Sequence, residues 1–330
     1  MQPFSYDHAS DLASASRNAA VATSFIAGGT SMLDLMKLNV MRPAALVDIN
    51  TLATPGMHVI EASGDRLRIG ALARMADVAA HADVARHYPL VAQSLAMAAS
   101  AQLRNMASIA GNVLQRTRCS YFRDVSWAAC NKREPGSGCA ALGGFNRLHA
   151  VLGGSDQCIA SYPGDFAQTL AALDASVHIT GPTGERVVRF EDLHRRPGAA
   201  PQVETTLEPG DIITSFEVAG APWMRRSAYV KVRDRASYAF AITSVAIALD
   251  LDGDIVRHVR LALGGVATVP WRAHEAEAAL TGKPLTPENA SAAAKAAYVG
   301  AQPYKHNAFK IPLGEATIVR ALMQTAALQF

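Results

Sequence analysis

Short apolar runs alternate with a helix-like segment in the first 50 residues. Ser24–Ala27 is typical of a buried strand, Gly28–Ser31 of a turn, Met32–Asn39 of a helix and Ala45–Ile49 of a second strand. A proline between the helix and the second strand ends the helical pattern. This order predicts a βαβ unit at the start of the chain.

The middle of the chain mixes a hairpin, helices and strands. The expected hairpin joins Val59–Ile60 to Leu67–Ile69 around Gly64–Asp65. Helices are expected at Ala73–Ala82, Leu90–Ala101 and Phe166–Leu173, and strands at Ser176–Ile179 and Arg186–Val188.

Beyond Pro222 the pattern changes to long apolar and alternating runs. Strands are expected at Tyr229–Val232, Ile242–Leu251 and Val259–Leu263, covered by helices at Ala273–Leu280, Ala290–Tyr298 and Ile318–Leu328. The aspartates around Gly253 lack the glutamate that closes an EF-hand loop, so they indicate a hairpin turn. The whole order predicts an α+β fold that ends in an antiparallel sheet covered by helices.

Composition narrows the class of protein. A chain of 330 residues suggests two or three domains at roughly 150 residues each. Half of the residues are hydrophobic, which excludes wholesale disorder. The net charge of 31 − 28 = +3 is too small to indicate nucleic acid or a membrane surface as the main partner. We expect no membrane span and no secretory signal in Met1–Ser10, hence folding in the cytoplasm.

Two glycine-containing segments are candidates for binding phosphate. Ala27–Ser31 lies between a predicted strand and a predicted helix, where backbone N–H groups and glycines allow close approach to an anion. Ala107–Asn112 offers small residues and the polar side chains of Ser108 and Asn112. A tight turn and a helix end with a glycine stop are the alternatives. Together the two segments could form the walls of one dinucleotide groove.

All four cysteines lie within one stretch that has little periodicity, residues 116–149 and just beyond. Their spacing is Cys119-x10-Cys130-x8-Cys139-x18-Cys158, which matches neither the usual zinc pairs nor ferredoxin runs. Six basic side chains against two acidic ones would offset the charge of a thiolate-bound cluster. From spacing alone, a [4Fe–4S] cluster, a zinc ion and unligated thiols all remain open. The lysine of Tyr229–Val230–Lys231 fits either a flavin contact or a solvated strand face.

Taken together, these motifs resemble the FAD-binding middle subunit of the xanthine dehydrogenase (molybdenum hydroxylase) family over essentially the whole chain. The matching segments are Ile26–Ser31 through Lys37, Ser108–Asn112, Ser161–Asp165, Tyr229–Lys231 and Leu263–Val266. The second motif carries Ala110 where a glycine is usual. The cysteine stretch resembles the periplasmic aldehyde oxidoreductase branch, whose middle subunit holds an extra [4Fe–4S] cluster.

The resemblance implies a fold and a site. It implies a two-lobed FAD-binding domain of the PCMH (vanillyl-alcohol oxidase-like) type, with lobes at 1–55 and 56–220, an iron–sulfur insertion at about 115–160 and a C-terminal domain at 221–330. The implied cluster ligands are Cys119, Cys130, Cys139 and Cys158. The implied FAD-binding residues are Ile26, Ala27, Gly28, Gly29, Thr30, Ser31, Met32, Ser108, Gly111, Asn112, Asp165 and Lys231.

The resemblance also implies a division of labour. A large partner with molybdenum cofactor would oxidise the organic substrate, and a small partner with two [2Fe–2S] clusters would carry electrons to FAD in this chain. FAD would pass them to an external acceptor, and no residue here would act on the organic substrate. Export to the periplasm with a partner that carries a twin-arginine signal is compatible with this branch. A self-sufficient FAD oxidase and a zinc-stabilised scaffold without enzymatic activity are the competing hypotheses.

Overall fold

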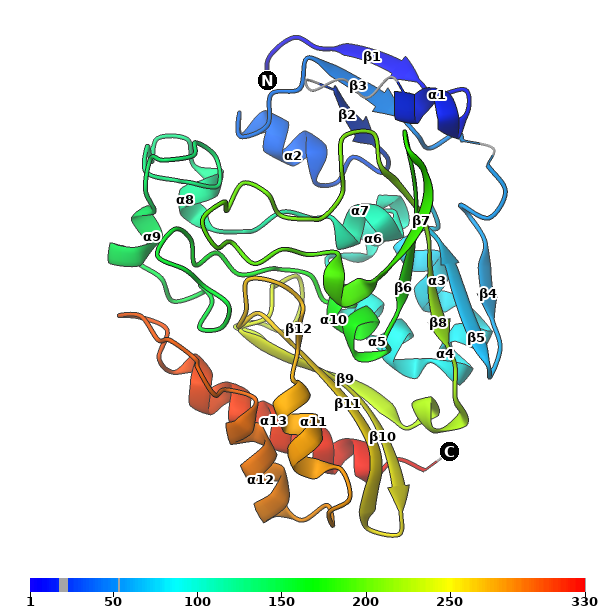
Figure 1. Ribbon diagram of the computed structural model, residues 1–330, viewed down its shortest axis with the longest axis vertical. Helices are drawn as coiled ribbons and strands as arrows, with labels where there is room; N and C mark the ends of the chain where they lie inside the picture. The colour runs from blue at the N-terminus through cyan, green and yellow to red at the C-terminus, as the bar shows by residue number, and fades with distance from the viewer. Residues whose placement is uncertain (18–22, 53, 330) are drawn as a thin grey trace.

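A small parallel sheet forms the N-terminal end of the molecule (Figure 1). The computed structural model describes residues 1–17, 23–52 and 54–329. The strand order is β1-β3-β2, and both pairs are parallel. The elements are β1 (Ser5–His8), α1 (Leu12–Arg17), β2 (Thr23–Ile26), α2 (Met32–Lys37) and β3 (Ala45–Asp48). The predicted βαβ unit is therefore confirmed. Strand β1 was not predicted, because all four of its residues are exposed and give no apolar alternation.

A five-stranded antiparallel sheet follows, with the order β4-β5-β8-β6-β7. Its strands are β4 (Ile60–Ala62), β5 (Arg66–Gly70), β6 (Ser176–Gly181), β7 (Gly184–Arg189) and β8 (Ile212–Ala219). The predicted hairpin and the two predicted strands are confirmed. The central strand β8 was not predicted; five of its eight residues are buried, and they do not follow a strict alternation.

Short helices lie between strands β5 and β6 in the chain. They are α3 (Met75–Ala80), α4 (Ala82–His87), α5 (Pro89–Met97), α6 (Ala101–Met106), α7 (Ile109–Val113) and α10 (Phe166–Ala172). The predicted helix at 90–101 ends early because Ala99 has a φ of 50°, which a right-handed helix cannot contain. Two short 3₁₀ helices, η1 (Phe190–Asp192) and η2 (Pro222–Arg225), lie before and after β8.

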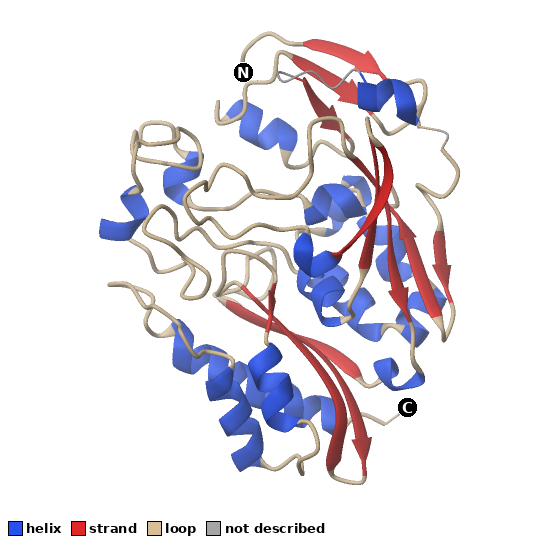
Figure 2. Ribbon diagram, viewed as in Figure 1, coloured by secondary structure: helices blue, strands red, loops and turns tan. Residues whose placement is uncertain are grey.

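The cysteine-bearing stretch is mostly loop and lies to one side of the molecule (Figure 2). It holds the one-turn helices α8 (Ser120–Arg123) and α9 (Ala140–Gly143). Phe122 and Cys130 pack with Leu35 of α2 in one small apolar cluster. Asp34 of α2 accepts hydrogen bonds from Arg118 at 3.1 Å and from Arg123 at 2.9 Å. The stretch is thus attached to the helix that follows the first glycine turn.

The C-terminal part is a four-stranded antiparallel sheet, β12-β11-β10-β9, with helices on one face (Figure 1). The elements are β9 (Ser227–Val232), β10 (Thr243–Asp252), β11 (Ile255–Gly264), β12 (Trp271–Arg272), α11 (His274–Leu280), α12 (Pro287–Ala296) and α13 (Lys310–Ala326). The predicted sheet, the covering helices and the turn at Gly253 are confirmed.

Strand β10 is buried on both faces, which explains its unbroken apolar run. Val245, Ile247 and Leu249 belong to the core beneath the C-terminal helices. Ala246 and Ala248 point into the core shared with the preceding sheet and helices. Because side chains alternate along a strand, the large residues fill one core and the small ones let the other layer approach.

The predicted α+β class is confirmed. We propose to keep the domain boundaries near residues 55 and 220, because each of the three sheets draws its strands from one of the resulting ranges. Among the residues that the structure describes, no helix has both the length and the apolar character needed to cross a bilayer.

Candidate functional site

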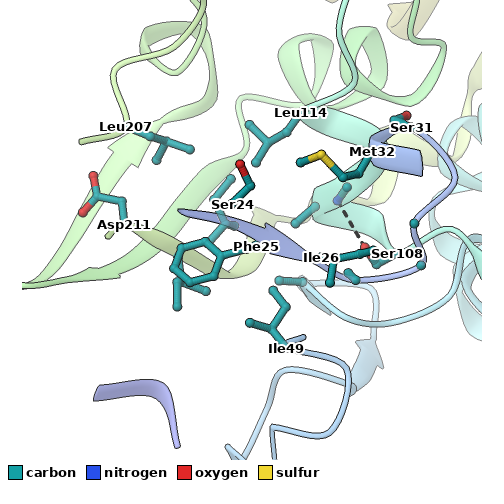
Figure 3. Close-up of a pocket in the computed structure, with 18 of the residues that line it drawn as sticks. Ser24, Phe25, Ile26, Ser31, Met32, Ile49, Ser108, Leu114, Leu207 and Asp211 are labelled. Atoms are coloured by element: carbon teal, nitrogen blue, oxygen red, sulfur yellow. Dashed lines mark hydrogen bonds between the residues drawn. The ribbon is translucent and has the colours of Figure 1, made fainter. Parts of the chain in front are cut away.

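A cavity lies between the N-terminal sheet and the second lobe (Figure 3). It has a volume of about 520 Å³. Its walls are the β2–α2 turn, the start of α7 and the segment that leads into β8. Both predicted glycine segments line it, through Ile26, Ala27, Gly28, Gly29, Thr30, Ser31 and Met32 from the first and Ser108 and Gly111 from the second. The structure therefore brings the two segments to one cavity.

Gly28 is required where the two glycine segments meet. A Cβ atom at this position would lie 1.9 Å from the carbonyl oxygen of Met106, well inside contact distance. Gly29, next to it, has a φ of 70°, a backbone conformation that residues with a Cβ atom rarely adopt. The first glycine thus lets the segments touch, and the second shapes the turn.

Two short helices begin at this cavity. Ser31 is the N-cap of α2, but its hydroxyl makes no capping hydrogen bond. Ser108 is the N-cap of α7, and its Oγ accepts a hydrogen bond from Gly111 N at 3.2 Å (dashed in Figure 3). The second segment thus begins α7 directly after the end of α6, and Gly111 lies inside α7 rather than acting as a glycine stop. Asn112, further along α7, does not line the cavity; its Oδ1 is buried and has no partner within the described residues.

The cavity suits a dinucleotide such as FAD. Small residues and backbone N–H groups at the two turns can approach a diphosphate closely. Apolar side chains, including Phe25, Ile49, Leu114 and Leu207, supply surface for aromatic rings. Sequence reasoning missed the wall at 207–213 and the cation Arg116 as a lining residue. The segment at 207–213 carries no motif, and Arg116 was counted only as one basic residue among six.

Asp165 and Lys231 do not line this cavity; they contact each other. Lys231 Nζ lies 2.8 Å from Asp165 Oδ2, and Tyr229 donates a hydrogen bond to Asp165 Oδ1 at 2.7 Å. Lys231 also donates to the carbonyl of Met97 at 3.1 Å. Burial raises the pKa of Asp165, against the opposing effect of Lys231. The two predicted residues thus form a buried ion pair between α10 and β9.

All four cysteine side chains line one small cavity of their own. Cys130 and Cys158 are buried, Cys119 and Cys139 are partly buried, and all are free thiols. Residues 130 and 139 face each other in an isolated antiparallel bridge. The structure therefore brings together cysteines that are up to 39 positions apart (158 − 119) in the sequence.

Backbone N–H groups point at these sulfur atoms. Cys119 receives them from residues 121 and 122, and Cys139 from residues 141, 142 and 159. Burial raises the pKa of Cys119 to about 11, whereas the hydrogen bond from Cys158 lowers the pKa of Cys139. His149 Nε2 lies 3.1 Å from Cys119 Sγ. N–H groups directed at sulfur stabilise thiolates, which is the form that binds metal.

Within the described residues, no three histidine, cysteine or carboxylate side chains are arranged to hold one metal ion. A [4Fe–4S] cluster differs from a single ion, since each thiolate binds a separate iron atom and the four sulfurs stand farther apart. Four cysteines around one cavity, with N–H donors at the sulfurs of Cys119 and Cys139, supply the number and type of ligands that such a cluster takes.

Two family models match nearly the whole chain. Residues 1–219 match the FAD binding domain in molybdopterin dehydrogenase, and residues 227–325 match the CO dehydrogenase flavoprotein C-terminal domain. The boundary between the matches falls between β8 and β9.

Relatives and solved structures agree with these matches. The chain is 44% identical over 330 residues to the aldehyde oxidoreductase FAD-binding subunit PaoB of Escherichia coli (strain K12), covering 99% of each chain. It is 26% identical over 279 residues to the carbon monoxide dehydrogenase medium chain of Hydrogenophaga pseudoflava, covering 84% of this chain and 79% of that one. A solved structure of carbon monoxide dehydrogenase from the latter organism superposes with a TM-score of 0.76 at 26% identity, covering 99% of both chains. Quinoline 2-oxidoreductase from Pseudomonas putida 86 shares the fold, with a TM-score of 0.74 at 21% identity and coverage of 98% and 97%. The chain belongs to the FAD-binding medium subunits of the molybdenum hydroxylase family and is an oxidoreductase subunit.

Proposed function

We propose that this chain is the FAD- and [4Fe–4S]-containing electron-transfer subunit of a molybdenum-cofactor aldehyde oxidoreductase complex. Electrons would arrive from the two [2Fe–2S] clusters of a small partner and leave from FAD to an external acceptor. The single observation that carries the iron–sulfur part is the meeting of Cys119, Cys130, Cys139 and Cys158 around one cavity. The identity to an aldehyde oxidoreductase subunit supports the assignment to that kind of complex.

The residues of this chain would place the cofactors rather than act on the substrate. FAD, when bound, supplies the redox chemistry. Gly28, Gly29, Thr30 and Ser31 would hold its diphosphate through backbone N–H and hydroxyl groups. Ser108 and Gly111 would hold oxygens on the opposite wall, whereas Asn112 lies outside the cavity. Asp165 and Lys231 pair with each other outside this cavity, so we propose no contact of either side chain with the diphosphate.

Apolar side chains exposed on the cysteine-bearing stretch support a role in an assembly. Val125, Trp127, Phe145 and Leu148 are all between 41% and 64% exposed, and exposed apolar patches commonly mark protein interfaces. The proposed partners are a large molybdenum-cofactor subunit and a small iron–sulfur subunit.

Folding in the cytoplasm, followed by export with a partner that carries a twin-arginine signal, remains part of the proposal. Fractionation of cells that produce the whole complex tests it.

The proposal is tested by cofactor analysis of the purified complex and of a Cys130→Ser variant. We expect the variant to lose the iron and acid-labile sulfide of one cubane cluster per complex, together with its low-temperature EPR signal. Most of the FAD should stay bound, because Cys130 does not line the FAD cavity. Ser126→Ala, a change on the same loop at an exposed residue, is the matched control.

Other results would favour the competing hypotheses. An unchanged EPR spectrum in Cys130→Ser would contradict the ligand role. Zinc near one atom per chain, without iron, would favour the scaffold. Catalytic turnover by the isolated chain would favour a self-sufficient oxidase.

A further inference from the structure

One carboxylate joins two cations between the FAD cavity and the cysteine cavity. Glu204 accepts a hydrogen bond from Arg116 Nε at one oxygen. At its other oxygen it accepts one from Lys132 Nζ at 3.0 Å. Lys132 Nζ also donates to the carbonyl of Pro201 at 2.8 Å. The two cations therefore share a single anion.

The two cations belong to different cavities. Arg116 lines the FAD cavity, whereas Lys132 lines the cysteine cavity with Cys158. A third cavity, of about 40 Å³, lies at the junction and is lined by all three charged residues. Glu204 thus occupies the position where the surroundings of the two proposed cofactors meet.

The group is held in place from several directions. The guanidinium carbon of Arg116 lies 4.6 Å from the centroid of the Phe122 ring, and Phe122 lines the cysteine cavity. The side chains of Arg116, Lys132 and Glu204 are only 24%, 10% and 27% exposed. Water therefore screens these charges less than it screens surface charges.

The charge of Glu204 is negative at neutral pH. Burial acts to raise the pKa of Glu204, but the nearby charges of Arg116 and Lys132 outweigh it and hold the pKa below its usual value. One negative charge between two positive charges leaves these three side chains with a net charge of about +1.

We propose that Glu204 is a positioning residue that couples the FAD cavity to the cysteine cavity, holding Arg116 at the first and Lys132 at the second. Its charge sets the reduction potentials of both cofactors together. The inference rests on the proposed function, since it requires both FAD and a cluster. Reduction adds negative charge to either group, so a more positive surrounding raises its potential.

The test is a redox titration of the complex that carries Glu204→Gln, a variant that keeps the shape but removes the charge. Visible absorbance follows the flavin, and EPR follows the cluster. We expect both potentials to shift upward. Glu134→Gln, the same change at an exposed position of the cysteine-bearing stretch, is the control and should shift neither. Equal potentials in the two variants would overturn the inference.

A second variant keeps the test informative if Glu204→Gln does not fold. Lys132→Gln removes a positive charge beside the cysteines, so the potential of the cluster should shift downward, opposite in sign. A cluster potential that is unchanged or raised in this variant would overturn the coupling. Cofactor content separates the two proposals. A wild-type complex that contains no iron would overturn the proposed function. If the complexes contain FAD and the cluster but the variants have the same reduction potentials as the wild type, only the coupling is overturned.

Discussion

Lys231 Nζ lies 2.8 Å from Asp165 Oδ2, and the two side chains are 1% and 4% exposed. The pair joins the start of α10 to strand β9, and so connects the second lobe to the C-terminal sheet. The sequence led us to expect separate cofactor contacts for these two residues. In the structure they form a buried ion pair with each other. The pair therefore also contributes to the stability of the fold.

Breaking this pair on one side should be costly. Lys231→Met or Asp165→Asn alone leaves a buried charge without its partner, and we expect a loss of about 3–5 kcal/mol in the free energy of unfolding. The double variant should lose much less than the sum. Urea unfolding of the four proteins measures the coupling. Asp234→Asn, which breaks the more exposed pair with Arg147, should cost about 1 kcal/mol or less. A double variant whose loss of stability equals the sum of the losses in the two single variants would contradict the prediction.

Gly28→Ala should reduce FAD occupancy. The added methyl group would lie 1.9 Å from the carbonyl oxygen of Met106, so the two glycine segments must separate. The cavity between them would lose its shape. Flavin absorbance per protein measures the effect after purification. Gly143→Ala, where an added methyl group has no atom within 4 Å, should keep full occupancy. Equal flavin content in both variants would count against the role of Gly28.

His149 should tune the proposed cluster through its contact with Cys119 Sγ at 3.1 Å. Burial, followed by the charge of Lys310, lowers the pKa of His149 to about 4, so the ring is neutral at pH 7. A neutral ring that donates its N–H to sulfur raises the potential of a cluster. His149→Leu should therefore lower the potential, and His149→Gln should restore part of it. An EPR-monitored redox titration measures the potential of the cluster in the wild type and in both variants. Equal potentials in all three proteins would refute the donor role.

Lys310 should make stability depend on pH. Its Nζ is buried and donates to the carbonyls of His149 at 3.0 Å and Gly265 at 2.7 Å. Burial, together with the charge of Arg147, lowers its pKa to about 7. Between that value and the unfolded value near 10.5, the unfolded chain binds more protons. Stability conferred by this residue therefore rises with pH, by at most about 1.4 kcal/mol per pH unit.

The check is urea unfolding of the wild type and Lys310→Met at about pH 7 and about pH 9.5. The difference in stability between the two proteins should grow in favour of the wild type at the higher pH. Lys283→Met, at an exposed position, should show no such trend. Parallel pH profiles for the wild type and Lys310→Met would rule out the predicted titration.

Local patterns in the chain predicted those parts of the site that depend on neighbouring residues. The turn at Gly28–Ser31 follows a short apolar run and precedes a helix, and the structure has that order. The long apolar run at 242–251 predicted a strand, because residues that are buried on both faces of a sheet must all be apolar or small. Such features are visible in sequence because they depend on the periods of strand and helix.

Only the tertiary structure decided how distant segments meet. Strand β8 lies between β5 and β6, and the residues that precede it form one wall of the FAD cavity. Glu204 contacts Arg116 across 88 positions of sequence, and cysteines with irregular spacing line one cavity. The pairing of Asp165 with Lys231 is of the same kind. Long-range contacts of this type are set by packing and by strand pairing across the whole fold, and these leave no local period in the sequence.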